Sequence, residues 1–209
     1  MEDGVKPGLP TLYLIRHGET AWSLSGQHTG HTDIPLTAQG EVMARELAPL
    51  LDPVPFIQIW TSPRQRARRT CELAAPGRTA TIEPDLAEWD YGDYEGLHTA
   101  DIRKTSPRWS VFRDGCPGGE TLDNVVSRAD RLLVRLRRAQ GNIALFSHGQ
   151  FGCVLAARWA HLAGREGEHF ALDPASLSIL GPKPGHPEVP VITRWNIVPL
   201  ARLDYRNPD

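Results

Sequence analysis

The segments Leu12-Tyr-Leu-Ile-Arg-His-Gly18 and Asn142-Ile-Ala-Leu-Phe-Ser-His-Gly149 share one pattern, in which a short apolar run ends near a histidine that glycine follows. Each apolar run is typical of a buried strand that opens into a loop. Ligands of α/β proteins bind at the carboxyl ends of the strands. If these two strands are parallel neighbours, the imidazoles of His17 and His148 converge on one point at that edge of the sheet.

The rest of the chain alternates between helical and extended patterns. We expect helices from Thr37 to Pro53, from Ser62-Pro63 to about Ala74, over 122–136 and from Gly149 through Trp159. Strands are expected at 56–60, 142–146, 176–180 and 190–197, and the segment 83–96 is expected to be a loop. Strands that alternate with helices predict an α/β three-layer sandwich. No linker or internal repeat divides the chain, so we expect one domain over residues 1–209.

Composition restricts the partners of this chain. Its 209 residues carry a formal net charge of −2, so no global field attracts nucleic acid or an acidic membrane. No apolar run is long enough to cross a bilayer, and the N-terminus has no signal-peptide pattern. The cysteines, Cys71, Cys116 and Cys153, are odd in number and lack CxxC spacing. A reduced, cytoplasmic location is the expectation.

Two arginines accompany the paired histidines. Arg16 precedes His17, and Arg66 lies near the start of the helix expected after the second strand. Guanidinium groups match phosphate oxygens with bidentate geometry, so two of them with two imidazoles suit a dianionic phosphoryl group. The neighbours Arg64 and Arg68 are expected on the solvated face of that helix.

An acidic and aromatic segment, 86–96, offers a proton donor. A carboxyl group in a partly apolar setting can protonate a departing alkoxide near neutral pH. Spacing alone leaves Glu88, Asp90, Asp93 and Glu95 open for this role. The spacing does not fit a calcium-binding EF-hand, and the chain has no HExxH and no Cys/His pairs with zinc spacing. We therefore expect neither a metal nor a cofactor.

Leu14-Ile-Arg-His-Gly-Glu-Thr20 resembles the signature of the histidine phosphatase superfamily, the phosphoglycerate mutase-like enzymes. The likeness continues through 26–30, 35–40, 61–67, 86–96 and Ser147-His-Gly149, in the family's order. It implies an α/β/α sandwich with a mostly parallel central sheet.

The resemblance also implies a role for each matching residue. His17 matches the nucleophile that becomes phosphohistidine, and Glu88 matches the acid that protonates the leaving group and then activates water. Arg16, Arg66 and His148 match the groups that hold the phosphoryl oxygens. Nucleophilic catalysis of this kind replaces one difficult displacement by two easier ones.

Residues beyond these five are implied to bind substrate. Thr29 and Gly30 match a loop that closes over the phosphate, with Gln27 near it. Ser23 stands where many members have an asparagine that contacts the phosphate, which puts the role of Ser23 in doubt. Arg113 is a candidate for a second phosphate, and an exposed loop arginine is an equal alternative.

Three functions are compatible with this family. The segments around Trp22, Arg66, Tyr91 and Arg113 resemble sugar bisphosphatases, including fungal sedoheptulose bisphosphatase, and some bacterial acid phosphatases. Cofactor-dependent mutases carry an added segment with paired arginines, whereas 109–121 has no such pair. A phosphatase of a small phosphorylated metabolite is therefore expected, ahead of a phosphoglycerate mutase and a non-catalytic adaptor. A homodimer is left open.

Overall fold

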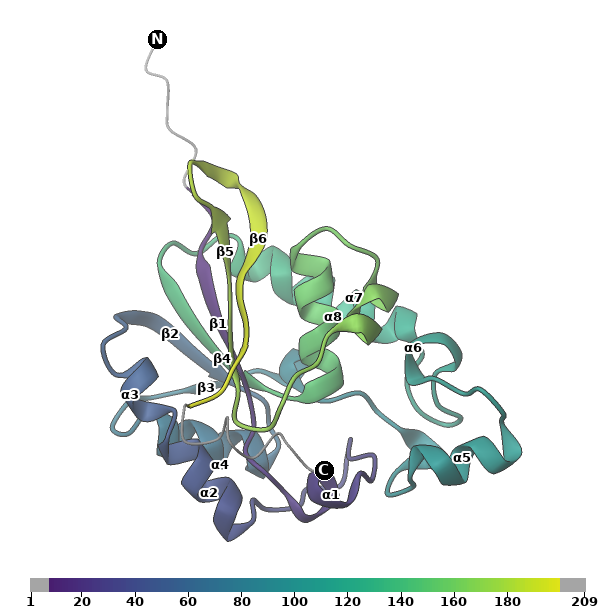
Figure 1. Ribbon diagram of the computed structural model, residues 1–209. Helices are drawn as coiled ribbons and strands as arrows, with labels where there is room; N and C mark the ends of the chain where they lie inside the picture. The colour runs from purple at the N-terminus through teal and green to yellow at the C-terminus, as the bar shows by residue number, and fades with distance from the viewer. Residues whose placement is uncertain (1–7, 200–209) are drawn as a thin grey trace, which may run out of the picture.

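A computed structural model describes residues 8–199 and shows a six-stranded sheet between two groups of helices (Figure 1). The strands lie in the order β3 (Thr81–Ile82), β2 (Phe56–Thr61), β4 (Asn142–Ser147), β1 (Thr11–Arg16), β5 (Leu177–Lys183) and β6 (His186–Ile197). Pairing is parallel from β3 through β2 and β4 to β1, whereas β5 runs antiparallel to β1 and β6 antiparallel to β5. The prediction of a mostly parallel α/β sheet is confirmed.

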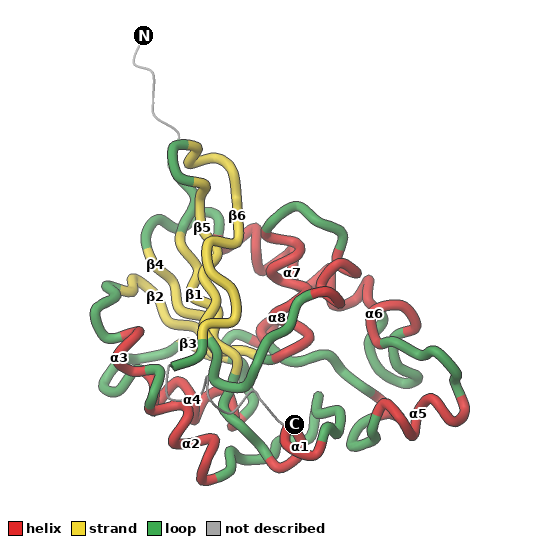
Figure 2. Tube along the Cα trace, in the orientation of Figure 1, coloured by secondary structure: helices red, strands yellow, loops and turns green. Residues whose placement is uncertain are grey.

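Helices cover both faces of this sheet (Figure 2). Helices α2 (Ala38–Arg45), α3 (Ala48–Leu51) and α4 (Gln65–Ala74) lie on one side, and α7 (Leu122–Leu136) and α8 (Gly149–Trp159) lie on the other. The remaining elements are α1 (Ala21–Ser25), α5 (Thr99–Thr105), α6 (Val111–Asp114) and the 3₁₀ helices η1 (Pro84–Leu86), η2 (Gly92–Tyr94) and η3 (Gly164–His169). Among residues 8–199, no helix is both long and apolar enough to cross a bilayer.

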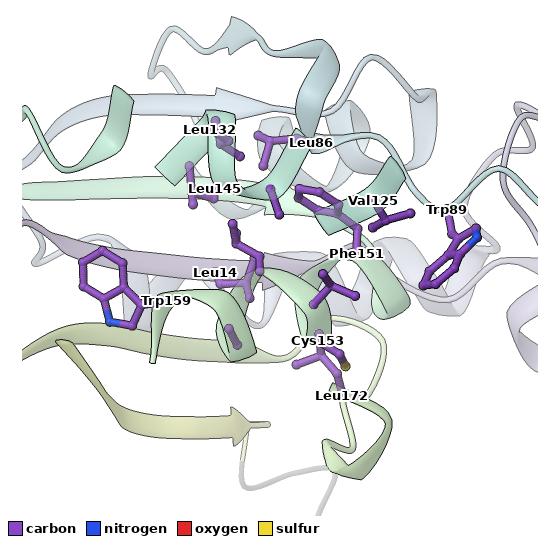
Figure 3. Close-up of a cluster of buried hydrophobic side chains, with 14 of the residues drawn as sticks. Leu14, Leu86, Trp89, Val125, Leu132, Leu145, Phe151, Cys153, Trp159 and Leu172 are labelled. Carbon is purple, nitrogen blue, oxygen red and sulfur yellow. The ribbon is translucent and has the colours of Figure 1, made fainter. Parts of the chain in front are cut away.

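The central strands are buried on both faces because their side chains alternate between two cores. Leu14 of β1 and Leu145 of β4 join the core under α7 and α8, where Phe151 and Trp159 also lie (Figure 3). Ile15 belongs to the opposite core, under α3 and α4. Burial on both faces explains why β1 and β4 are nearly continuous apolar runs.

Two predicted helix boundaries are wrong. The helix expected from Thr37 to Pro53 is divided into α2 and α3, because Pro49 has no N–H to donate to a carbonyl one turn earlier. The helix expected from Ser62-Pro63 begins at Gln65, since Arg64 is extended, with φ −73° and ψ 135°. Asp33 caps this end by accepting a hydrogen bond of 2.7 Å from the Gln65 amide.

Short elements escaped the sequence analysis. Helix α1 depends on a reciprocal capping box between Thr20 and Ser23, and the expected loop at 83–96 contains η1 and η2. Strand β6 begins at His186, before the expected start at 190. It includes Pro187 and Pro190, which an edge strand tolerates because fewer of its N–H groups take part in pairing.

We predict that Leu14→Ala lowers the free energy of unfolding by about 2–5 kcal/mol, because it leaves a cavity between β1 and α8. Leu14 is fully buried, whereas Leu24 is 71% exposed and serves as the matched control. Leu24→Ala should change stability by less than about 0.5 kcal/mol. Urea unfolding followed by circular dichroism measures both, and equal effects of the two substitutions would contradict this account of the core.

Candidate active site

His17 follows β1 and is held by its own backbone. Its amide donates to the Ser147 carbonyl at 3.0 Å, and its carbonyl accepts from the Ala175 amide at 2.9 Å. The ring Nδ1 lies 2.7 Å from the Gly18 carbonyl oxygen, which can only accept, so Nδ1 carries the proton. This contact leaves the Nε2 lone pair free. Gly18 is required here, because a Cβ would lie 2.4 Å from the Gly40 carbonyl oxygen.

His148 reaches the same point from β4. Parallel pairing places Arg16 beside Ser147, so the residues that follow each strand are also neighbours. The two imidazole centroids are 5.1 Å apart with an interplanar angle of 65°. His148 Nε2 lies 2.7 Å from the Ser62 hydroxyl. The convergence predicted from the two His-Gly motifs is therefore present.

Both imidazoles are kept neutral by their surroundings. Burial lowers the pKa of His17 well below 6.5, and the positive charges of Arg66 and Arg16 lower it further. The pKa of His148 is also lowered well below 6.5, first by burial and then by Arg66. A neutral imidazole has a lone pair available, which a nucleophile or an acceptor needs.

Arg16, which is half-buried, and Arg66 place two cations beside these rings. Arg16 donates from an Nη to the Leu172 carbonyl, and Arg66 is fully buried. The Nη atoms of Arg66 donate to the Thr29, Gly30 and Thr32 carbonyls at 3.0–3.1 Å. Within residues 8–199, the buried Nε atoms of both arginines and Nδ1 of His148 have no hydrogen-bond partner. Each of these atoms is a polar group left unpaired in the protein interior.

Glu88 lies against the first turn of α8. Its Oε1 accepts from the Trp89 and Phe151 amides at 2.8 Å each, and its Oε2 accepts from the Gln150 amide at 3.0 Å. The carboxylate thereby uses amides at the helix N-terminus that have no partner within the helix. Helix α8 starts directly after His148. The helix N-terminus that binds the Glu88 carboxylate is therefore next to the histidine pair.

The candidate pocket is a cavity of about 250 Å³ in front of these groups. Its lining comprises Arg16, His17, Trp22, Ser23, Gly26, Gln27, His28, Thr29, Glu88, Tyr91, Gly149, Gln150, Cys153, Phe170 and Leu172. Arg66 and His148 adjoin His17 and do not line this cavity.

Hydrogen bonds within the protein hold the residues predicted to bind substrate. The Ser23 hydroxyl accepts from the Thr20 amide at 2.8 Å, and Gln27 Nε2 donates to the Gly96 carbonyl at 2.9 Å. Thr29 Oγ1 donates to the Gln27 carbonyl at 3.2 Å. The Gly30 amide donates to the Glu95 carboxylate at 2.9 Å, and Gly30 does not line the pocket. Ser23, Gln27 and Thr29 do line it.

Arg113 lies apart from the other predicted site residues. It lines a separate cavity of about 510 Å³ with Arg108, Tyr94 and Trp109, and it donates to the Arg108 carbonyl. Arg64 is half-buried, contrary to its expected position on a solvated face, whereas Arg68 is exposed as predicted.

Sequence analysis missed several pocket residues. His28 stacks on Tyr91 with ring centroids 4.6 Å apart, and its Nε2 lies 3.1 Å from Thr99 Oγ1. Burial lowers the pKa of His28. Phe170 and Leu172 come from the segment after η3, which carries no recognisable motif. The available signal for His28 was its position in 26–30, a segment that resembles the family.

No group of three or more His, Cys, Asp or Glu side chains within residues 8–199 is arranged to hold a metal ion. Reaction without a metal nevertheless stays a prediction.

Comparison with known proteins identifies the family. The model of the histidine phosphatase superfamily, branch 1, matches residues 12–197. An acid phosphatase of Mycobacterium tuberculosis is 42% identical over 179 residues, 81% of this chain and 85% of that protein. Sedoheptulose 1,7-bisphosphatase of Saccharomyces cerevisiae is 35% identical over 182 residues, 72% of this chain and 67% of that protein.

A solved structure shows the same fold. The product of an open reading frame from Mycobacterium tuberculosis superposes with a TM-score of 0.82 and 38% identity, covering 90% of this chain and 98% of that one. The chain therefore belongs to the histidine phosphatase superfamily. By class it is a phosphoric monoester hydrolase.

The lowered histidine pKa values predict how stability depends on pH. In the unfolded chain, both imidazoles bind protons as the pH falls through about 6.5, whereas in the folded protein they stay neutral. The unfolded state then binds more protons, so the free energy of unfolding should decrease between about pH 7 and pH 5.

Urea unfolding at several pH values measures this slope, and His17→Gln should reduce it by removing one contributing group. NMR titration of the ring nitrogens gives the folded pKa values directly. A folded pKa of His17 at or above 6.5 would contradict the electrostatic description of the site.

Proposed function

We propose that the protein hydrolyses a phosphate monoester of a small metabolite through a phosphohistidine at His17. The observation that carries this proposal is the contact between His17 Nδ1 and the Gly18 carbonyl, at 2.7 Å. It directs the free Nε2 lone pair away from the backbone in a ring whose pKa is lowered by burial and then by the positive charges of Arg66 and Arg16. A buried, neutral and oriented imidazole is suited to attack phosphorus.

The reaction has two displacements. In the first, His17 Nε2 forms a bond to phosphorus while the bond to the ester oxygen breaks, and the Glu88 carboxyl gives its proton to the departing alkoxide. In the second, water attacks the phosphohistidine, Glu88 takes a proton from that water, and the N–P bond breaks. Inorganic phosphate leaves, and His17 is again neutral.

Charge at the transferred phosphoryl group is balanced by fixed positive charge around His17. Arg16 lines the pocket beside His17, and the positive charge of buried Arg66 also acts on the His17 ring. Charges fixed in this way need no reorganisation when negative charge develops in the reaction. This local positive charge supports a dianionic phosphoryl group as the natural occupant.

The lining of the pocket supports a substrate with a small leaving group. Beyond the phosphoryl site its walls are Trp22, Gln27, His28 and Phe170, which combine apolar surface with neutral hydrogen-bonding groups. Arg113 lines another cavity, which favours a substrate with one phosphate in this pocket. A sugar monophosphate or a similar polar monoester is therefore our first choice, and a sugar bisphosphate is the second.

The cellular setting is also a proposal. Cys71, Cys116 and Cys153 are free and buried, which agrees with a reducing cytoplasm. A single domain over residues 1–209 and a possible homodimer are further predictions.

His17→Ala should reduce turnover by more than about a thousandfold, because no other described group replaces the nucleophile. Phosphoenzyme, detected by intact mass spectrometry at alkaline pH, should disappear with it. His186→Ala is the control, since His186 is exposed and begins β6, in the β5–β6 hairpin far from His17 (Figure 1). Turnover that survives His17→Ala in homogeneous protein would exclude the covalent mechanism.

Phosphate release distinguishes hydrolysis from isomerisation. Without added metal, the protein should release phosphate from sugar monophosphates faster than from 3-phosphoglycerate, with no 2-phosphoglycerate formed. Sugar bisphosphates are assayed in parallel. Efficient isomerisation of phosphoglycerate with little free phosphate would instead establish a mutase, and preference for a bisphosphate would overturn our choice of substrate.

A further inference from the structure

A largely buried ion pair between Arg128 and Glu120 contacts the segment that carries Glu88. Arg128 of α7 donates from Nε to Glu120 Oε1 at 2.7 Å and from an Nη to Glu120 Oε2 at 3.0 Å. The Arg128 side chain is 10% exposed and that of Glu120 is 21% exposed. The pair is therefore largely removed from solvent, unlike most ion pairs on a protein surface.

The other N–H donors of Arg128 bind carbonyl groups of the backbone that leads into Glu88. One Nη donates to the Asp85 and Ala87 carbonyls at 2.9 and 2.7 Å, and the other donates to the Glu88 carbonyl at 3.1 Å. Together with the two bonds to Glu120, all five guanidinium N–H donors are used. Arg128 thus fixes three carbonyls in the last four residues up to Glu88.

Glu120 holds the chain on the other side of Glu88. Its Oε2 accepts from the Asp90 amide at 2.9 Å, and its backbone carbonyl accepts from Trp89 Nε1 at 2.9 Å. Gly119 permits this close approach, because a Cβ there would lie 2.3 Å from the Asp90 carbonyl oxygen. Residues before and after Glu88 are therefore fastened to one ion pair.

The same arginine also contacts the helix that binds the Glu88 carboxylate. Its Cζ lies 4.4 Å from the centroid of the Phe151 ring, and the Phe151 amide donates to Glu88 Oε1 at 2.8 Å. A cation over an aromatic face is attracted more strongly in a desolvated site than at an exposed one. Arg128 consequently connects the backbone of Glu88 to one of the amides that orient its carboxylate.

We propose that Glu120 and Arg128 are positioning residues, which set the orientation of the Glu88 carboxyl group toward the leaving group. A buried ion pair is weak support for stability, because desolvation offsets the attraction between its charges. Its contacts here converge on one residue, so orientation accounts for them better than stability does. The inference rests on the proposed acid role of Glu88.

The variants are Glu120→Gln, which keeps the shape and removes the charge, and Arg128→Lys, which keeps the charge and loses the planar fork. Asp130→Asn and Arg158→Lys are the matched controls. Arg158 of α8 donates to both carboxylate oxygens of Asp130 of α7, at 2.8 and 3.0 Å. This control pair joins α7 to α8 and makes no hydrogen bond to the Glu88 loop, although it is more exposed than the Glu120–Arg128 pair.

The kinetic readout is kcat/KM for nitrophenyl phosphate and for an alkyl phosphate. A good leaving group needs no proton, so Glu88→Gln should slow the alkyl ester selectively. Glu120→Gln and Arg128→Lys should lose about tenfold more kcat/KM on the alkyl ester than on the nitrophenyl ester, a part of the full contribution of an acid. The two controls should leave this ratio unchanged.

Hydrogen exchange tests the same inference without catalysis. The amides of Trp89, Gln150 and Phe151, which bind the Glu88 carboxylate, should exchange at least about tenfold faster in both variants than in the controls. Unchanged exchange, equal losses on the two esters, or failure of both variants to fold would overturn the positioning role. If Glu88→Gln itself shows no leaving-group dependence, the proposed acid role fails, and exchange still decides whether the pair orients Glu88.

Discussion

The parallel pairing of β1 with β4 is the constraint on which the rest of the site depends. Residue-by-residue register brings Arg16 beside Ser147, and the next residue on each strand is a histidine. No side-chain contact has to be found for the imidazoles to meet, because backbone hydrogen bonds already fix the strand ends. Both strands are buried on each face, so a shift in register would disturb two cores at once.

Burial then determines the chemistry of those strand ends. His17 and Arg66 are almost fully removed from solvent, and desolvation is the largest cause of the lowered pKa of each. An imidazole beside buried guanidinium groups is disfavoured as a cation, which keeps it nucleophilic. The positive potential that suppresses its protonation is also the potential that attracts a phosphate dianion. The proposed binding of phosphate and the proposed attack by His17 thus rely on one arrangement.

Motifs located the centre of the site from sequence, whereas packing determined its periphery. Paired His-Gly motifs after apolar runs predicted that His17 and His148 meet, and the family resemblance selected Glu88 among four carboxyl groups. Phe170 and Leu172 could not be found, because they come from a segment without periodicity or motif. Arg113 was a reasonable candidate by resemblance, but the segment 106–117 folds around another cavity. Helix boundaries failed where one proline or one distant cap decided them, as at Pro49 and Asp33.

The two edges of the sheet have a consequence for assembly. Strand β3 offers only two residues, and β6 at the opposite edge contains Pro187 and Pro190. Very short edge strands and edge prolines both discourage a second chain from adding its own strand. Continuation of the sheet across a subunit boundary is therefore disfavoured at the β6 edge, whereas β3 covers only Trp60 and Thr61 of β2 and leaves residues 56–59 of that strand at the other edge.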